Sequence, residues 1–303
     1  MTIPARSASM AWPDERIARL AAGRTMVFAP GGTSLLYFLE HGSTAEGYSK
    51  EAAFTDYGRR SLRRTVELVA MMARTGMQMV FVVGFVPGQD HRTQTYNANL
   101  RWGYELLVDD GARALYRQHD LGVLFRGGWD ALFERLGAEH LSTAVRDLEA
   151  ATAAQSKPWL VWLTQSAAPV PQALTGLVAE HIRAHGRMPP REDLCAAYYN
   201  RPISHVDILL GHNKPSLAGL IPPMMTVGDA YFSVRPSYYL TRDTWRHILY
   251  NHLFSRRTSH RDYDAISAGD LESLRAFYDD SPHTLGIGRL HEPTQTWRPV
   301  LPD

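Results

Sequence analysis

Thr25-Met-Val-Phe-Ala-Pro-Gly-Gly-Thr-Ser-Leu-Leu36 joins a strand, a turn and the start of a helix in one short stretch. Residues 25–28 are of strand type, and a proline and two glycines follow shortly after them. Two hydroxyl residues then precede an apolar segment, which is the usual pattern of a capped helix start. Consecutive glycines let backbone N–H groups converge, and the helix N-terminus adds partial positive charge. The stretch therefore predicts a phosphate-holding turn formed by Gly31, Gly32, Thr33 and Ser34. An ordinary helix start without a ligand is the alternative.

The composition is that of a soluble globular protein with no nucleic-acid-binding surface. The 303 residues suffice for one large domain or two small ones, and 45% apolar and 21% charged residues are ordinary values. Lys and Arg number 32 against 31 for Asp and Glu, which gives a net charge of +1. A surface that binds nucleic acid normally shows a clear basic excess. We therefore expect no nucleic-acid partner.

Cysteine content and hydropathy indicate the compartment. Cys195 is the only cysteine, so the chain has no internal disulfide and suits a reducing environment. The N-terminal residues contain no apolar run of the kind that directs secretion. No segment approaches the roughly 18 apolar residues that a transmembrane helix requires. The sequence predicts a cytoplasmic protein without a transmembrane segment.

Strand-like and helix-like segments alternate along the chain. Residues 77–85 form an almost unbroken apolar run, which is typical of a parallel strand buried on both faces. The predicted strands are 25–28, 77–85, 121–128, 158–166, 205–213 and 229–234. The predicted helices are 13–22, 34–40, 58–75, 95–119 with a break near Gly111, 129–136, 141–154, 172–185, a short helix holding Cys195, 241–254 and 268–279. We expect a loop or lid at 41–55 and a tail at 282–303. The alternation predicts an α/β fold, a single domain with a mostly parallel six-stranded sheet flanked by helices on both faces.

Ligands of parallel sheets bind at the carboxyl ends of the strands, which here are rich in glycine, proline and polar residues. His212, Asn213 and Lys214 end the fifth strand, where a histidine can act as general acid or base and a lysine can bind phosphate. Arg92 follows the second strand, where a guanidinium can clamp phosphate or carboxylate. The alternatives are a hydrogen-bonding turn for His212 and a surface ion pair for Arg92. Hydrolase, P-loop and dinucleotide motifs are absent from the sequence.

Three blocks of the sequence resemble the cis-prenyltransferase family, that is, undecaprenyl diphosphate synthase and its relatives. Residues 58–92 resemble the family's helix and strand leading to an arginine. Residues 206–232 resemble its segment between two late strands, and 235–257 resemble its final helix and arginine-rich end. The resemblance rests on element order more than on motifs. It implies an N-terminal arm and short helix (1–22), a cis-prenyltransferase-like α/β domain (23–258) and a C-terminal extension (259–303).

The resemblance also implies a ligand, a metal and an oligomeric state. Family members bind isoprenoid diphosphates with Mg²⁺ and are usually dimers. The family's metal-binding Asp-Gly-Asn is replaced here by Pro30-Gly31-Gly32, and its diphosphate-binding arginines are replaced by residues 211–215. Asp229 stands where the family has a metal-binding glutamate, and Arg92 is retained. The resemblance assigns Mg²⁺ to Asp229, with a solvated or helix-capping acid as the alternative. It implies a homodimer, or a heteromer with a chain-elongating homologue.

We therefore expect a divergent cis-prenyltransferase-like enzyme that acts on an isoprenoid diphosphate in specialised metabolism. Its reaction would be an irregular condensation, a prenyl transfer or a cyclisation, with Asp229 and His212 as catalytic residues. Two alternatives stay open. One is a non-catalytic or lipid-binding partner subunit of a chain-elongating synthase, which the lost Asp and Arg residues favour. The other is a scaffold reused for a different phosphorylated or carboxylated substrate.

Overall fold

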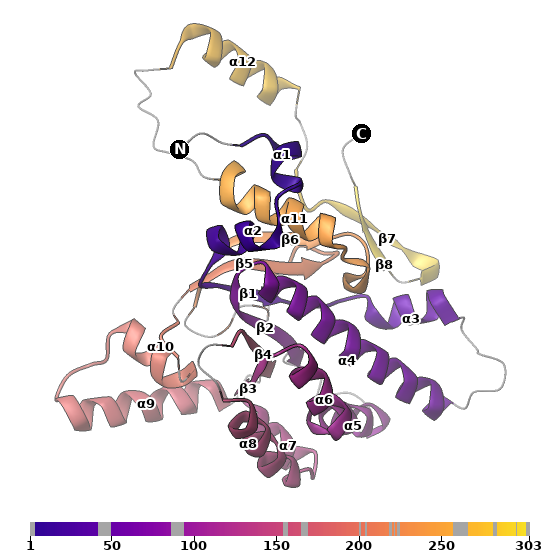
Figure 1. Cartoon of the computed structure of the whole chain (residues 1–303), viewed down its shortest axis with the longest axis vertical. Coiled ribbons are helices and arrows are strands. Elements are labelled where there is room, and N and C mark those ends of the chain that lie inside the picture. The colour runs from indigo at the N-terminus through magenta and orange to yellow at the C-terminus, as the bar shows by residue number, and fades with distance from the viewer. Residues whose placement is uncertain are drawn as a thin grey trace.

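Six strands form the sheet at the centre of the molecule. They are β1 (Arg24–Phe28), β2 (Met77–Phe85), β3 (Gly122–Gly127), β4 (Trp159–Thr164), β5 (His205–His212) and β6 (Thr226–Ser233). Their order is β3-β4-β2-β1-β5-β6, and every neighbouring pair is parallel (Figure 1). The computed structural model describes residues 4–41, 50–85, 94–153, 157–164, 169–199, 201–203, 205–217, 220, 222, 225–256, 266–280, 284–294 and 296–300. The predicted parallel six-stranded α/β fold is confirmed.

Helices connect and cover the strands. They are α1 (Arg6–Met10), α2 (Asp14–Ala21), α3 (Thr33–His41), α4 (Lys50–Arg74), α5 (Gln94–Val108), α6 (Asp110–Gln118), α7 (Trp129–Arg135), α8 (His140–Thr152), α9 (Pro169–His185), α10 (Arg191–Tyr199), α11 (Arg242–Tyr250), the π-helix η3 (Asn251–Ser255) and α12 (Ala268–Asp279). A short 3-10 helix, η2 (Ser237–Tyr239), precedes α11. None of the helices within the described residues is both long and apolar enough to cross a membrane.

The two faces of the sheet carry covers of unequal size. Successive side chains of a strand point to opposite faces. In β1, Met26 and Phe28 pack with the helices of one face, whereas Val27 packs into the other. The first face is covered by α2, α4 to α8 and α11. The second is covered by α10, through Cys195 and Tyr199, and by connecting segments. Cys195 is therefore a buried core residue.

The order of the strands places a crevice at the end of β1. The chain moves from β1 to β2 on one side and later to β5 on the other side. In open α/β sheets, ligands bind outside the carboxyl ends of the strands at such a change of direction. The glycine turn predicted from the sequence lies at this position, between β1 and α3.

Helix α4 is longer than the sequence pattern predicts. It begins at Lys50, so residues 50–55 of the expected loop are helical, and 42–49 lie outside the described residues. Position 58, inside the helix, is a glycine because a Cβ there would collide with the ring of Trp102 on α5. This aromatic packing offsets the low helix propensity of glycine. Gly76, with a φ of +104°, lies two residues beyond the helix, at its predicted end.

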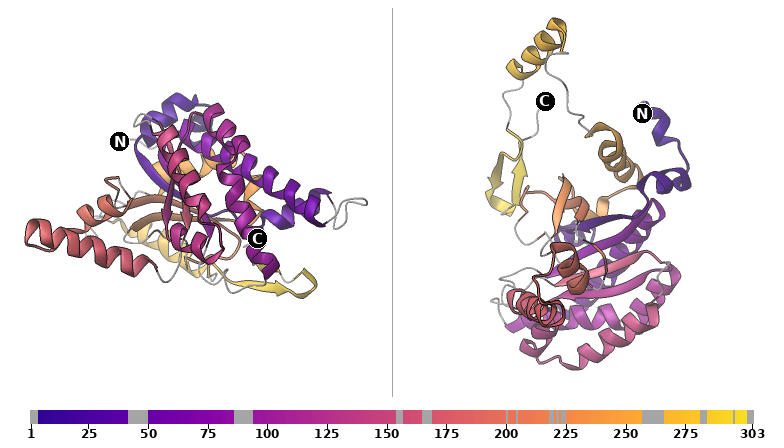
Figure 2. Two further views of the ribbon diagram at one scale, coloured as in Figure 1. Left: turned by 90° about the horizontal axis from the view of Figure 1, so that it is seen from below. Right: turned by 90° about the vertical axis from the view of Figure 1, so that its left-hand side faces the viewer.

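The C-terminal extension contains one element that the sequence pattern predicts and one that it misses. Helix α12 has the predicted bounds, buries none of its residues and stands away from the sheet in Figure 1 and in the right-hand view of Figure 2. The expected tail instead contains an antiparallel hairpin of β7 (Gly288–His291) and β8 (Thr296–Pro299). Asn213 donates a hydrogen bond of 2.6 Å to the carbonyl of Trp297, which fastens the hairpin to the end of β5.

Candidate functional site

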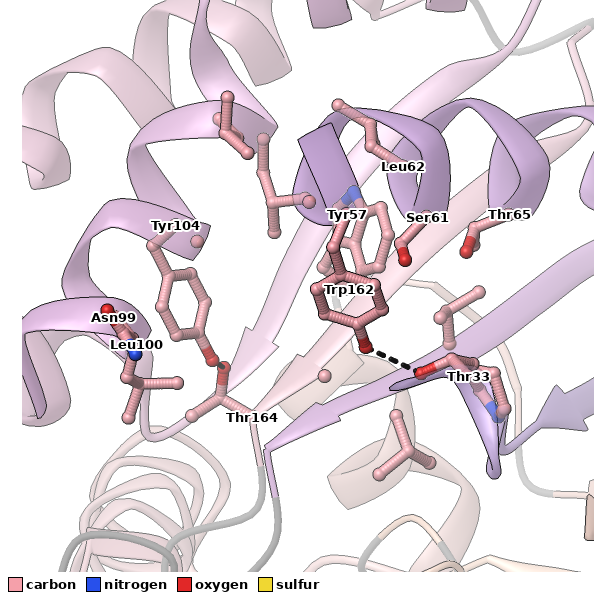
Figure 3. Close-up of a pocket in the computed structure, with 18 of the residues that line it drawn as sticks. Thr33, Tyr57, Ser61, Leu62, Thr65, Asn99, Leu100, Tyr104, Trp162 and Thr164 are labelled. Carbon is pink, nitrogen blue, oxygen red and sulfur yellow. Dashed lines mark hydrogen bonds between the residues drawn. The ribbon is translucent and has the colours of Figure 1, made fainter. Parts of the chain in front are cut away.

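A cavity of about 420 Å³ lies at the carboxyl ends of β1, β2 and β4, under α4 and α5 (Figure 3). Its walls are mainly aliphatic and aromatic, and no charged side chain lines it among the described residues. The side chains that form the apolar walls are Phe54, Leu62, Val82, Val83, Leu100, Tyr104, Leu106, Leu107, Trp162 and Leu163. Pro30 and Thr33 bring the glycine turn to the same cavity. A predominantly apolar cavity with a few polar groups is the common form of a ligand site.

Hydroxyl groups mark one side of the cavity. Thr33 Oγ1 and Tyr57 Oη lie 2.7 Å apart and share a hydrogen bond, which joins α3 to α4 (Figure 3). Thr65 Oγ1 and Tyr238 Oη form a second pair at 3.0 Å. Burial raises the pKa of Tyr238 to about 12, so its phenol stays protonated. These residues can donate hydrogen bonds to an oxygen-rich ligand at neutral pH.

The glycine turn is fixed by η2. Gly31 N–H donates to Ser237 Oγ at 2.9 Å, and Ser237 N–H donates to the Gly31 carbonyl at 3.0 Å. The N–H groups of Gly32, Thr33 and Ser34 have no hydrogen-bond partner among the residues that the structure describes. They are the first donors at the N-terminus of α3, and Gly32 has a φ of +67°. Such a group of N–H donors at a helix start is a ready anion site.

His212 lies directly on this turn. A Cβ on Gly31 would be 2.8 Å from His212 Cβ, and a Cβ on Gly32 would be 2.7 Å from His212 Nε2. Its Nδ1 is 3.1 Å from the carbonyl of Ser233 and 3.0 Å from that of Arg235, so Nδ1 carries a proton. Burial lowers the pKa of His212, and the two carbonyls offset this only in part. The neutral ring therefore turns its Nε2 lone pair toward the glycine turn.

The other predicted ligand-binding residues are placed differently. Asn213 has a φ of +56° and is occupied by the hairpin carbonyl of Trp297. Lys214 is exposed and is not part of the cavity wall. Arg92 falls in 86–93, outside the described residues. The structure thus unites Gly31, Gly32, Thr33, Ser34 and His212, and it does not bring Asn213 or Lys214 into the cavity.

Asp229 lies on β6 at the level of Ile208 on β5, whereas His212 pairs with Ser233 at the end of the strands. Four residues of strand correspond to about 13 Å, so Asp229 is far from the glycine turn. Its two oxygens are engaged, by His252 Nδ1 at 2.6 Å and by Arg256 Nη1 at 3.4 Å.

The donor set of the described residues does not fit Mg²⁺ at the glycine turn. Mg²⁺ prefers carboxylate oxygens, and Asp229, to which the family resemblance assigns the metal, lies far from the turn and is paired with two cationic or hydrogen-bonding side chains. The cavity wall contains no Asp or Glu among the described residues. No group of three or more metal-ligating side chains occurs in the part of the chain that the structure describes.

The hydroxyl residues of α4 were missed from the sequence, although a signal exists. Tyr57, Ser61 and Thr65 recur every four residues and line the cavity together. This spacing puts all three on one face of a helix. Ser237 and Tyr238 could not be found this way, because they reach the site from a segment far away in the sequence.

Comparison with known proteins finds relatives that cover most of the chain. No protein-family model matches the chain. It is 27% identical over 288 residues to a tuberculosinyl adenosine transferase of Mycobacterium tuberculosis, with 91% of each chain covered. It is 25% identical over 279 residues to a (+)-kolavelool synthase of Herpetosiphon aurantiacus, with 89% of this chain and 88% of that protein covered.

Two solved structures share the fold. Lavandulyl diphosphate synthase from Lavandula x intermedia, in complex with dimethylallyl diphosphate, has a TM-score of 0.58 at 14% identity over 79% of this chain and 98% of its own. A probable undecaprenyl diphosphate synthase from Campylobacter jejuni has a TM-score of 0.53 at 12% identity over 78% of this chain and 96% of its own. These identities establish the shared fold alone.

Proposed function

Because this chain is a divergent member of the cis-prenyltransferase family, we propose that it binds an isoprenoid diphosphate and transfers the prenyl group to an acceptor. One relative is a tuberculosinyl adenosine transferase, and the lavandulyl diphosphate synthase structure holds dimethylallyl diphosphate. The observation that carries the proposal is the apolar cavity of about 420 Å³ that reaches Pro30 and Thr33 at the start of α3. A prenyl chain suits these walls, and a diphosphate suits the N–H donors of the turn.

The side chains of the site suit the loss of diphosphate from an allylic carbon. As the C–O bond breaks, negative charge grows on the diphosphate, where the N–H groups of residues 32–34 and the dipole of α3 stabilise it. The allylic carbon gains positive charge among aromatic residues that line the cavity, including Tyr57, Tyr104 and Trp162. The faces of aromatic rings stabilise cations. Charge separation is therefore supported at both ends of the breaking bond.

An acceptor other than isopentenyl diphosphate agrees best with the end of β5. A second diphosphate requires cationic side chains, and the sequence has no Arg between Asp207 and Gly228. Asn213 is bound to the hairpin, and Lys214 is exposed. We therefore favour prenyl transfer, or cyclisation with water as the acceptor, over chain elongation in a specialised pathway.

Calorimetry with geranyl diphosphate and dimethylallyl diphosphate tests the proposal, once with Mg²⁺ and once with a chelator. We expect binding in both conditions, because the donors identified here are N–H and hydroxyl groups and not carboxylates. Product analysis by mass spectrometry then separates transfer, condensation and cyclisation. Absence of binding in every condition would remove the proposal.

Gly103→Phe provides a variant that fills the cavity. Gly103 lines the cavity from α5, and a Cβ there meets nothing within 4 Å. We expect Gly103→Phe to weaken geranyl diphosphate binding at least tenfold and to leave inorganic pyrophosphate binding unchanged. Gly176→Phe on α9 is the matched control, because its Cβ also meets nothing within 4 Å and it lies outside this cavity. Equal affinity in both variants would place the prenyl chain elsewhere.

A non-catalytic subunit is the second candidate, favoured by the engaged carboxylate of Asp229. In that case geranyl diphosphate binds but no product forms, and adding a chain-elongating homologue restores turnover. Pyrophosphate binding that gains nothing from a prenyl tail would instead favour a scaffold reused for another phosphorylated substrate.

A further inference from the structure

The imidazole ring of His212 fills the space that side chains of the glycine turn would occupy. A Cβ added to Gly31 would lie 2.8 Å from both Cβ and Cδ2 of His212, and one added to Gly32 would lie 2.7 Å from its Nε2. Real Cβ atoms do not approach other atoms so closely. The two glycines therefore admit the ring, carried by the end of β5, into direct contact with the turn.

Two backbone carbonyls determine which ring nitrogen is left for a ligand. Nδ1 of His212 lies 3.1 Å from the carbonyl oxygen of Ser233 and 3.0 Å from that of Arg235. A carbonyl only accepts hydrogen bonds, so Nδ1 carries a proton. Nε2 has no hydrogen-bond partner among the residues that the structure describes, and in the neutral ring it carries a lone pair. A lone pair beside the N–H donors of the turn repels an anion unless Nε2 takes up a proton.

A diphosphate at the turn requires more positive charge than the backbone supplies. A single phosphate group carries about −1.5 to −2 charges at neutral pH, whereas a helix N-terminus is equivalent to about half a positive charge. Among the described residues, no charged side chain lines the cavity. Protonation at Nε2 would turn His212 into an imidazolium, in which both nitrogens donate hydrogen bonds and the ring carries a full positive charge.

The surroundings keep the ring of His212 neutral while the site holds no anion. Burial lowers the pKa of His212, the two carbonyls offset this in part, and no charged side chain is among the causes. The first turn of α3 contains no acidic residue. The charged side chains of the adjoining strands and of the segment before η2 have other partners or face solvent: Arg235 lies over the ring of Tyr239, Lys214 is exposed, Asp207 accepts from Thr25 N–H, and Asp229 is bound by His252 and Arg256. An anion on the turn would therefore bring the first opposite charge to the ring, and an opposite charge favours the imidazolium.

We infer that His212 is the proton-exchanging catalytic residue of the diphosphate site: it takes up a proton at Nε2 when the diphosphate binds, and it gives that proton to the diphosphate as the prenyl group departs. The inference rests on the proposed function and assigns it a specific side chain. As the bond between the allylic carbon and oxygen breaks, both electrons stay on the oxygen, and the proton moves from Nε2 to the diphosphate. The ring is then neutral again. The allylic cation bonds to a lone pair of the acceptor, whose proton passes to solvent.

Proton uptake on binding tests the inference in the wild-type protein. Calorimetry with unreactive geranyl thiodiphosphate is carried out at pH 7.5, with a chelator present, in buffers that differ in their enthalpy of ionisation. Phosphate groups lose their second proton with a pKa of about 6, so the ligand itself is almost fully ionised at this pH. We expect uptake of about half to one proton per ligand bound. NMR of the ¹⁵N-labelled protein should show one histidine that changes from the neutral Nδ1–H form to the imidazolium.

Two substitutions on β5 separate His212 from the other histidines. His212→Gln keeps a hydrogen-bonding side chain but exchanges no proton. Wild-type affinity should fall about tenfold between pH 7 and pH 8.5, because binding consumes a proton that becomes scarcer as the pH rises. We expect His212→Gln to lose this pH dependence and the proton uptake, and to bind at least tenfold more weakly at pH 7. His205→Gln is the matched control, since His205 lies at the opposite end of the strand, where its Nδ1 is 2.8 Å from Thr226 Oγ1.

Turnover of geranyl diphosphate tests the second half of the inference. Release of diphosphate should be at least tenfold slower in His212→Gln, and its rate should no longer fall as the pH rises. A cooperative urea transition checks that each variant is folded. A merely structural role for His212 would slow the reaction but leave the wild-type pH profile in place.

The possible results separate this inference from the proposed function. If geranyl thiodiphosphate binds without proton uptake, or if His212→Gln keeps the uptake and the pH dependence, the role of His212 is overturned and the prenyl cavity stands. If binding requires Mg²⁺ and takes up no proton, the metal supplies the charge, and the role of His212 is likewise overturned. If geranyl thiodiphosphate binds in no condition, the proposed function fails, and the inference fails with it.

Discussion

At the scale of single residues, His212 explains why position 31 is a glycine. Gly31→Ala would place a Cβ 2.8 Å from the Cβ of His212, closer than real side chains approach, so the turn or β5 must shift. Overpacking of this kind typically costs about 1–3 kcal/mol of the free energy of unfolding. We expect that loss in urea unfolding. The added Cβ would also lie 2.8 Å from Cδ2 of the His212 ring, so the part of the loss due to the ring should be recovered in Gly31→Ala/His212→Ala.

The control for this prediction is Gly176→Ala on α9, whose added Cβ meets nothing within 4 Å. Alanine is the better helix former by about 1 kcal/mol, so this variant should be as stable as wild type or more stable. A Gly31→Ala protein that unfolds at the wild-type urea concentration would contradict the contact with His212.

His212 also predicts a pH dependence of stability. Its pKa is lowered in the folded protein, chiefly by burial, whereas in the unfolded chain it is about 6.5. Above about pH 6.5 the ring is neutral in both states, and its contribution to stability is fully present. As the pH falls below that value, the unfolded chain takes up the proton first, so stability is lost. We expect the free energy of unfolding to fall more between pH 7.5 and pH 5.5 in wild type than in His212→Gln. Equal slopes in the two proteins would mean that His212 titrates normally.

Some of the site is local in sequence and some is not, which decides what the sequence can predict. The turn at 31–34 is one continuous stretch, so its strand, glycines and hydroxyls are visible in order. Asn213 and Asp229 have suitable chemistry, but their partners come from distant segments: Trp297 for Asn213, and His252 for Asp229. A side chain that already has such a partner cannot be recognised from its type and position alone.

At the scale of elements, hydrophobic pattern predicts the elements that a core requires. All six strands pair in parallel, and the buried apolar residues of β1 to β5 identify those five, whereas β6 at the edge of the sheet is only partly buried. The break predicted near Gly111 falls two residues earlier, because Asp109 caps α6 by accepting from Ala112 N–H at 2.7 Å. Residues 50–55 of α4 and the hairpin β7–β8 are missed, because the contacts that join them to the domain come from distant segments: Phe54 meets Trp102, and Asn213 binds the carbonyl of Trp297.

At the scale of the whole molecule, α12 is the element that the rest of the chain does not require. The Ser267 side chain caps it, and its apolar residues Leu271, Leu274, Phe277 and Tyr278 are between 43% and 66% exposed. Helices of this length are marginal in water without packing, and α12 buries none of its residues. The homodimer implied by the family resemblance stays a prediction, and α12 allows a test of it.

Replacing residues 266–280 with a flexible glycine-serine linker should leave the fold of the sheet intact, because α12 contributes no buried residue to it. We expect circular dichroism to show the same cooperative thermal transition in the variant as in wild type. Sedimentation equilibrium at matched protein concentration gives the molecular mass of each protein. If the mass halves and the transition falls with it, α12 holds two copies together, since association stabilises the folded state by mass action. A lower transition at unchanged mass would contradict the placement of α12 outside the core, because only contacts within one chain could then account for the loss.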